Sequence, residues 1–123
     1  MAVGIKKIYH VPPAMSEKIL ESTLKCVSKL GFESSVINLL KEGKYTDDDK
    51  LIEALLCMNQ DIGTGYDNGK VNIDKVMAEM FENKPEIRTV MEECDKDYSK
   101  NPGENFKNFL TCFREKAPFK VML

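Results

Sequence analysis

The chain has 123 residues, of which 42% are apolar and 31% charged, and its formal net charge is −2. These values predict a single globular domain over residues 1–123 with one modest core. They leave no excess of basic residues to neutralise phosphates, so nucleic acid is not expected as a partner. No apolar run approaches the about 18 residues of a membrane span, so we expect a soluble protein without membrane insertion.

The first 15 residues form an N-terminal arm that contains two adjacent lysines, two adjacent prolines and the only histidine, His10. The arm lacks the apolar segment of a signal peptide, so the chain is either intracellular or the mature form of a secreted protein. His10 is far in sequence from every cysteine and from most acidic residues. Since neither a catalytic triad nor a glycine-rich phosphate loop is available, we do not expect an enzyme.

Helical periodicity begins after this arm. Ser16 precedes the segment EKILESTLKCVSKLG, whose apolar residues recur at helical spacing, and Gly31 can end this first helix. A short second helix is predicted between Ser34, which can cap it, and Gly43. Both segments therefore predict helices that present one apolar stripe to a core.

The third and fourth helices have clear start signals. In TDDDKLIEALLCMNQ, Thr46 and Asp49 form a start that resembles a capping box, and the aspartates suit the positive end of the helix dipole. The fourth helix, around VMAEMF, is predicted to begin at Asn72 or Asp74.

The last two helices start at prolines. Pro85 suits the first turn of a fifth helix, and Asn101 followed by Pro102 opens a sixth that is rich in phenylalanine. No stretch alternates like a strand for more than a few residues, so the predicted fold class is all-α with about six helices.

The segment DIGTGYDNGKVNID contains acidic residues and glycines, as a calcium loop would. An EF-hand loop starting at Asp61 would need oxygen ligands where Gly63 and Gly65 stand, so no metal site is expected. Asn68-Gly69 is a hairpin signal, but its flanks are too short to form a sheet. The segment is therefore predicted to be the connector between the third and fourth helices.

Four cysteines, Cys26, Cys57, Cys94 and Cys112, lie one in each of four predicted helices. None forms a CxxC pair and no histidine is near, so zinc is not expected. Two alternatives stay open at this point. The cysteines are either four buried thiols of an intracellular protein or two disulfides, for which three pairings are possible.

The second half of the chain carries most of its methionine and phenylalanine at helical spacing. Such stripes are typical of a core, and methionine also suits an interior that accepts ligands of varying shape. The tail, residues 117–123, ends in PFKVML, whose apolar side chains would be unfavourable in water. It is therefore predicted to fold back on the body, as ordinary core or as a cover over a cavity.

With one cysteine in the first helix, one in the third and one in each of the last two, the chain resembles the insect odorant-binding protein family of pheromone and general odorant-binding proteins. The glycine-rich turn that follows Cys57 is similar as well. Family members usually have six cysteines, and Glu53 and Gly103 stand here at the second and fifth positions. Losing both partners of one bridge matches the four-cysteine, or minus-C, subclass.

The resemblance implies the bridges Cys26–Cys57 and Cys94–Cys112, and a secreted carrier whose signal peptide has been removed. It also implies an internal apolar cavity that binds small hydrophobic molecules such as odorants, pheromones or fatty acids, without a cofactor, and that the tail covers on one side. The expected ligand-binding residues are Leu24, Val27, Leu55, Met58, Ile62, Val76, Met77, Met80, Phe81, Ile87, Val90, Met91, Phe106, Phe109, Leu110, Phe113, Phe119, Val121 and Leu123.

Three tyrosines, Tyr45, Tyr66 and Tyr98, could offer a hydroxyl to a polar ligand head. The sequence leaves open whether the protein forms a homodimer or contacts a receptor. The alternative function is a helical protein–protein interaction module with reduced cysteines and no small-molecule ligand.

Overall fold

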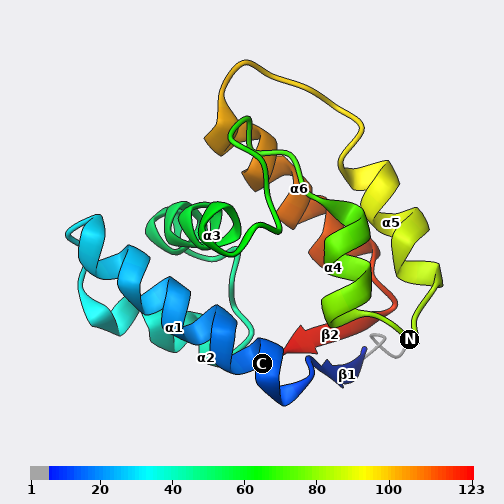
Figure 1. Cartoon of the computed structure of the whole chain (residues 1–123), viewed down its shortest axis with the longest axis horizontal. Coiled ribbons are helices and arrows are strands. Elements are labelled where there is room, and N and C mark those ends of the chain that lie inside the picture. The colour runs from blue at the N-terminus through cyan, green and yellow to red at the C-terminus, as the bar shows by residue number, and fades with distance from the viewer. Residues whose placement is uncertain (1–5) are drawn as a thin grey trace, which may run out of the picture.

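Six α-helices and one pair of short strands make up residues 6–123, the part of the chain that the computed structural model describes (Figure 1). The elements are β1 (Lys7–His10), α1 (Pro13–Lys29), the 3₁₀ turn η1 (Ser34–Val36), α2 (Ile37–Lys41), α3 (Asp49–Ile62), α4 (Ile73–Met80), α5 (Glu86–Cys94), α6 (Pro102–Lys116) and β2 (Phe119–Met122). The predicted all-α fold with six helices is confirmed.

Helix α1 begins earlier than the sequence signals indicated. It starts at Pro13, so Ser16 lies inside the helix and part of the predicted N-terminal arm is helical. Proline is favoured in the first turn because its missing N–H would have no helical partner there. The helix ends as predicted near Gly31, whose φ is 74°. The Phe32 N–H donates to the Val27 carbonyl at 3.0 Å, which is the long hydrogen bond of a Schellman motif.

The short second helix is the turn η1 followed by α2, and it has no side-chain cap at Ser34. Gly43 follows α2 with φ 75°. The positive φ favours glycine, and a Cβ at Gly43 would lie 2.5 Å from the sulfur of the Met122 side chain. The end of α2 therefore lies directly against the C-terminal strand.

The predicted capping box of α3 is wrong. Asp48, rather than Thr46 with Asp49, caps the helix, and its carboxylate accepts from the Lys50 and Leu51 N–H groups. A run of consecutive aspartates offers several candidate caps, and the sequence does not distinguish them. The predicted starts of α4 and α6 are confirmed, since Asn72 caps α4 and Asn101 caps α6.

The two ends of the described chain form a parallel two-stranded sheet, which the sequence did not predict. Lys7 pairs with Phe119 and His10 with Met122, and the Val11 N–H donates to the Met122 carbonyl at 2.9 Å. Each strand has four residues, too few for a clear alternating pattern. Its partner is at the opposite end of the chain, so only tertiary packing specifies this pair.

The connector, residues 63–72, forms a tight loop with a single antiparallel bridge between Gly65 and Val71. The hairpin signal at Asn68-Gly69 thus produces one bridge and no sheet. Gly69 has φ 83°, and a Cβ there would lie 2.0 Å from the Pro102 carbonyl oxygen. The loop therefore lies against the start of α6.

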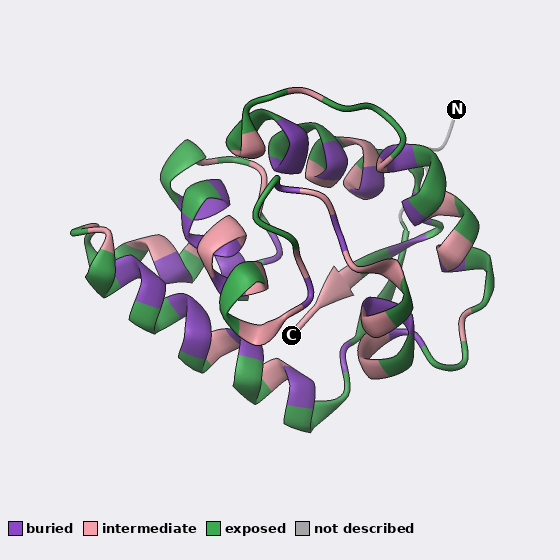
Figure 2. Cartoon of the chain, turned by 45° about the horizontal axis from the view of Figure 1, so that its top comes forward, coloured by how far each residue is buried: buried purple, intermediate pink, exposed green. Residues whose placement is uncertain are grey.

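Two disulfides join the helices in pairs, as the family resemblance implied. Cys26–Cys57 connects α1 with α3, and Cys94–Cys112 connects α5 with α6. In the view of Figure 1, α1 and α3 lie on the left and α4 and α5 on the right, with the strands below α4. Figure 2 shows that the helices turn their buried residues inward and their exposed residues outward.

Candidate ligand-binding cavity

An apolar cavity of about 130 Å³ lies between the two groups of helices. All six helices contribute to its wall, as do β2 and the connector. For comparison, a buried apolar cavity of about 150 Å³ holds benzene. The cavity is thus of a size for one compact organic molecule.

Most of the expected ligand-binding residues lie around this cavity. They come from α3 to α6 and from the tail, and they bring together side chains that are far apart in sequence. These residues are Leu55, Met58, Ile62, Val76, Met80, Phe81, Met91, Phe106, Phe109, Leu110, Phe113, Val121 and Leu123.

Six expected residues do not line the cavity. Val27, Met77, Ile87 and Phe119 are buried elsewhere, Val90 is partly buried against the core around α5, and Leu24 is 45% exposed. Leu24 lies on the outer side of α1 because the inner stripe of that helix consists of Ile19, Thr23 and Cys26. Apolar periodicity finds a buried helix face, but it does not separate the residues at a cavity from those between helices.

Six lining residues were missing from the expected set: Ile19, Leu40, Tyr45, Asn59, Thr64 and Val71. Ile19 and Leu40 belong to the apolar stripes of their helices, so helical periodicity could have identified them. Asn59 is polar, and Thr64 and Val71 are in the connector, where helical periodicity does not apply. Of the three tyrosines considered for their hydroxyl, Tyr45 lines the cavity, whereas Tyr66 and Tyr98 are exposed.

Polar groups are few in the wall. The buried Thr64 hydroxyl donates to Asn59 Oδ1 at 2.6 Å, so these two oxygens satisfy each other. Burial raises the pKa of the Tyr45 phenol, and the nearby Arg114 guanidinium acts in the opposite direction. Tyr45 therefore stays neutral and keeps its proton to donate.

Aromatic rings close one end of the cavity. Tyr9 from β1 lies with its ring centre 5.3 Å from that of Phe81 and 5.0 Å from that of Phe119, and Phe81 lies 6.1 Å from Phe113. The Tyr9 hydroxyl donates to the Met80 carbonyl, and burial raises the pKa of this phenol. The strand pair is thereby anchored to the end of α4, where Phe81 follows, and to Phe113 of α6 through the ring of Phe81.

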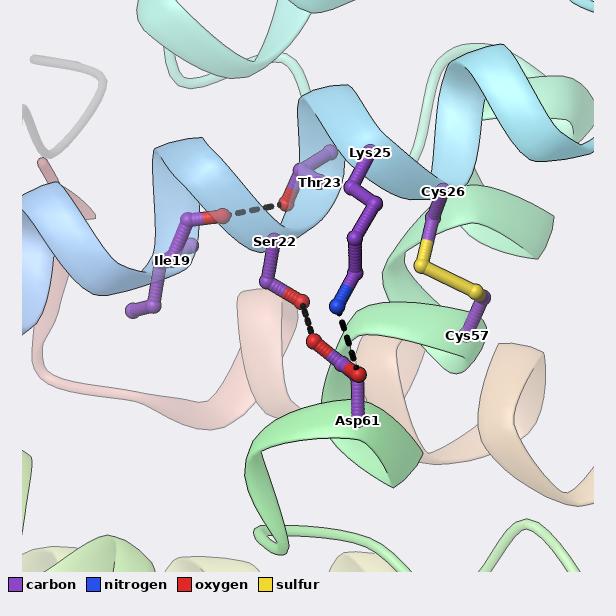
Figure 3. Close-up of a disulfide and its surroundings, with 7 residues drawn as sticks. All are labelled: Ile19, Ser22, Thr23, Lys25, Cys26, Cys57 and Asp61. Carbon is purple, nitrogen blue, oxygen red and sulfur yellow. Dashed lines mark hydrogen bonds and ion pairs between the residues drawn. A yellow bond between two sulfur atoms is a disulfide. The ribbon is translucent and has the colours of Figure 1, made fainter.

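The opposite wall is held by the disulfide Cys26–Cys57 and by a polar cluster next to it (Figure 3). The Ser22 hydroxyl donates to Asp61 Oδ2 at 2.8 Å, and Lys25 Nζ lies 2.9 Å from Asp61 Oδ1. The hydrogen bond from Lys25 and then that from Ser22 lower the pKa of the Asp61 carboxyl. These contacts fix α1 against the half of α3 that lines the cavity.

Polar contacts with residues 95–105 hold the connector, two of whose residues, Thr64 and Val71, line the cavity. Lys70 Nζ donates to the Asp95 backbone carbonyl and lies 3.8 Å from the Asp95 carboxylate. The buried Asn105 amide donates to the Asn68 and Ser99 carbonyls, both at 2.8 Å. The segment between α5 and α6 thus fixes the position of the connector.

The wall offers shape and apolar surface rather than reactive groups. Among residues 6–123, no group of three or more His, Cys, Asp or Glu is placed to hold a metal ion. In the same range, no helix is long and apolar enough to cross a membrane.

A comparison with known protein families shows which family the chain belongs to. The family model described as the PBP/GOBP family matches residues 9–116, which include all six helices. The chain belongs to the PBP/GOBP family. The resemblance to odorant-binding proteins is therefore confirmed, and two bridges formed by four cysteines are consistent with the minus-C subclass. Members of the PBP/GOBP family are carriers of small hydrophobic ligands and not enzymes. A search of curated proteins found no match to this chain.

Proposed function

We propose that this protein is a soluble, secreted carrier that encloses one small hydrophobic molecule in its internal cavity. The observation that carries the proposal is an apolar cavity lined by all six helices in a member of the PBP/GOBP family. Two disulfides support secretion, because such bonds persist mainly in oxidising compartments.

Ligands larger than the cavity fit if side chains in its wall move. Met58, Met80 and Met91 line it, and methionine adapts its shape more easily than branched residues do. We propose that the tail also moves. Leu123 borders both the cavity and an outer groove formed by His10, Val11 and α1, so a displaced tail would connect the two spaces.

A tryptophan introduced into the wall gives a direct test, since the chain contains no tryptophan. Phe113 lines the cavity, and Phe113→Trp replaces one aromatic ring by another. Titration with N-phenyl-1-naphthylamine should change its emission saturably. The matched control is Tyr98→Trp, at a site that is 66% exposed, where no saturable change is expected.

Displacement of the same probe then surveys volatiles, terpenoids and fatty acids. If neither the probe nor any of these compounds binds saturably, the carrier function is wrong. The alternative, an interaction module with reduced cysteines, is tested by alkylation under denaturing conditions. Two intact bridges leave the mass unchanged, whereas free thiols would all react.

A further inference from the structure

We infer that the cavity selects compact, uncharged molecules that carry a hydrogen-bond-accepting oxygen, and that it rejects carboxylates. This inference rests on the proposed carrier function and specifies the class of ligand. The family resemblance does not distinguish fatty acids from uncharged ligands. This inference separates them, because fatty acids are anions at neutral pH and alcohols, esters and ketones are not.

The first observation is that, among the described residues, no charged side chain lines the cavity. Within residues 6–123 the lining contains no Asp, Glu, Lys, Arg or His, and Tyr45, Asn59 and Thr64 are its only polar side chains. A carboxylate placed there would lose its water without gaining a cation. Buried charges without a partner are strongly unfavourable, and such a group takes up a proton instead.

The second observation concerns Arg114 and Lys75, two cations near lining residues that are both engaged with other groups. Arg114 lies 5.7 Å from the ring centre of Tyr45, but its guanidinium donates to the Asp47 carboxylate at 2.8 Å. Lys75 donates to the Ile62 backbone carbonyl at 2.7 Å. Neither residue lines the cavity, so neither provides a counter-ion for an acidic ligand.

The third observation is a hydrogen-bond donor in the wall. Tyr45 is partly buried, and within residues 6–123 its hydroxyl has no hydrogen bond. The Thr64 hydroxyl, in contrast, donates to the Asn59 side chain, whose amide nitrogen offers a second donor. A neutral ligand oxygen that accepts a hydrogen bond from the partly buried Tyr45 hydroxyl would gain a polar contact in a wall that is mainly apolar.

The size of the cavity limits the rest of the ligand. A volume of about 130 Å³ is close to the about 150 Å³ that holds benzene, so a single ring or a chain of similar bulk fits without a change in the wall. The inferred class is therefore one-ring or similarly compact alcohols, ethers, esters and ketones.

Three one-ring compounds of similar size separate the possibilities: 2-phenylethanol, phenylacetate and ethylbenzene. Their affinities are measured by titrating the ¹⁵N-labelled protein and following amide shifts of the lining residues. At neutral pH, 2-phenylethanol should bind at least about tenfold more tightly than phenylacetate, a difference of about 1.4 kcal/mol. As the pH falls through the pKa of phenylacetic acid, its neutral form appears and the gap should narrow, while 2-phenylethanol serves as the control for the protein.

The role of Tyr45 is tested with Tyr45→Phe, which removes the hydroxyl and keeps the ring. Since a hydrogen bond contributes about 0.5–1.5 kcal/mol net, 2-phenylethanol should bind about two- to tenfold more weakly. Ethylbenzene should bind unchanged. The matched control is Tyr98→Phe, on the exposed surface, which should change neither affinity.

The outcomes separate this inference from the carrier function. If phenylacetate binds as tightly as 2-phenylethanol at neutral pH, or if 2-phenylethanol fails to bind while N-phenyl-1-naphthylamine binds, the selectivity is wrong and the carrier function stands. If Tyr45→Phe weakens ethylbenzene as much as 2-phenylethanol, Tyr45 acts by packing and its role as donor is wrong. If no probe or compound binds at all, the carrier function itself fails.

Discussion

The cavity has two kinds of wall, and they are held in different ways. The α1–α3 wall combines a disulfide, direct helix packing and the polar cluster at Asp61. The closing segments are the connector (residues 63–72) and β2, and neither of the two disulfides lies in them. They are held by a four-residue strand pair, a few side-chain hydrogen bonds and the buried ring of Phe119.

This difference indicates where the protein opens. Local opening occurs first where few buried apolar contacts and hydrogen bonds must be broken, and last where packed helices are cross-linked. We therefore expect a ligand to reach the cavity by displacement of a closing segment, while the α1–α3 wall keeps its shape.

Removing the disulfide of the α1–α3 wall should have the largest effect. The bridge closes a sequence separation of 31 residues, and in the chain-entropy model its loss in Cys26→Ala/Cys57→Ala costs about 4 kcal/mol. Denaturant unfolding under non-reducing conditions measures the change in the free energy of unfolding. The double variant Cys94→Ala/Cys112→Ala, with a separation of 18, should lose about 3 kcal/mol. A loss below about 1 kcal/mol at Cys26–Cys57 would contradict the proposed role of this wall.

Truncating the buried ring of β2 should have the next largest effect. Phe119 packs against Tyr9 and Phe81, and Phe119→Ala should cost about 3 kcal/mol through lost burial and the cavity left behind. Lys120→Ala, at the neighbouring exposed position, should change stability by less than about 0.5 kcal/mol. Amide hydrogen exchange should show faster opening of β1 and β2 in Phe119→Ala, with α3 still protected. Equal loss of protection in α3 would mean that the tail is part of the main core.

The connector should depend on Asn105 to a smaller degree. Asn105→Ala removes the hydrogen bonds to the Asn68 and Ser99 carbonyls, each worth about 0.5–1.5 kcal/mol net, so it should cost about 1–3 kcal/mol. Asn108→Ala, at an exposed position of the same helix, removes no such contact and serves as the control. Thermal unfolding compares the two variants. Identical melting temperatures would show that Asn105 does not contribute to holding the connector.

The same contrast explains how much of the structure the sequence predicts. The helices, their apolar faces and the caps Asn72 and Asn101 depend on local signals, and these predictions are confirmed. The strand pair depends on residues at opposite ends of the chain, and no local pattern encodes it. For the cavity, periodicity identifies buried faces, but it does not indicate that Phe119 packs behind the wall while Asn59 lines it. Such a distinction depends on how helices are placed relative to one another.

The smallest effects concern two carboxyl groups, one in each region, whose pKa values are shifted in opposite directions. At the α1–α3 wall, hydrogen bonds from Lys25 and Ser22 lower the pKa of Asp61 from 3.8. At the connector, burial raises the pKa of Asp95 from 3.8, although the Val71 N–H and Lys70 act in the opposite direction. The two groups therefore affect stability in different pH ranges.

For Asp61, the ionised form is favoured in the folded state, so its contribution to stability is complete above 3.8 and is lost as the pH falls through its lower, folded-state pKa. For Asp95, burial disfavours the ionised form, so its cost to stability is present at neutral pH and disappears as the pH falls through its raised pKa. Asp61→Asn should thus lower stability at neutral pH, whereas Asp95→Asn should leave it unchanged or raise it.

Carboxyl ¹³C titration by NMR checks both pKa values directly. On acidification Asp95 should take up its proton before Asp61 does, so the connector loses its ion pair with Lys70 while the contact between α1 and α3 is still intact. Asp95 titrating below Asp61 would reverse this order, and the connector would then no longer be the first region of the protein to respond to acid.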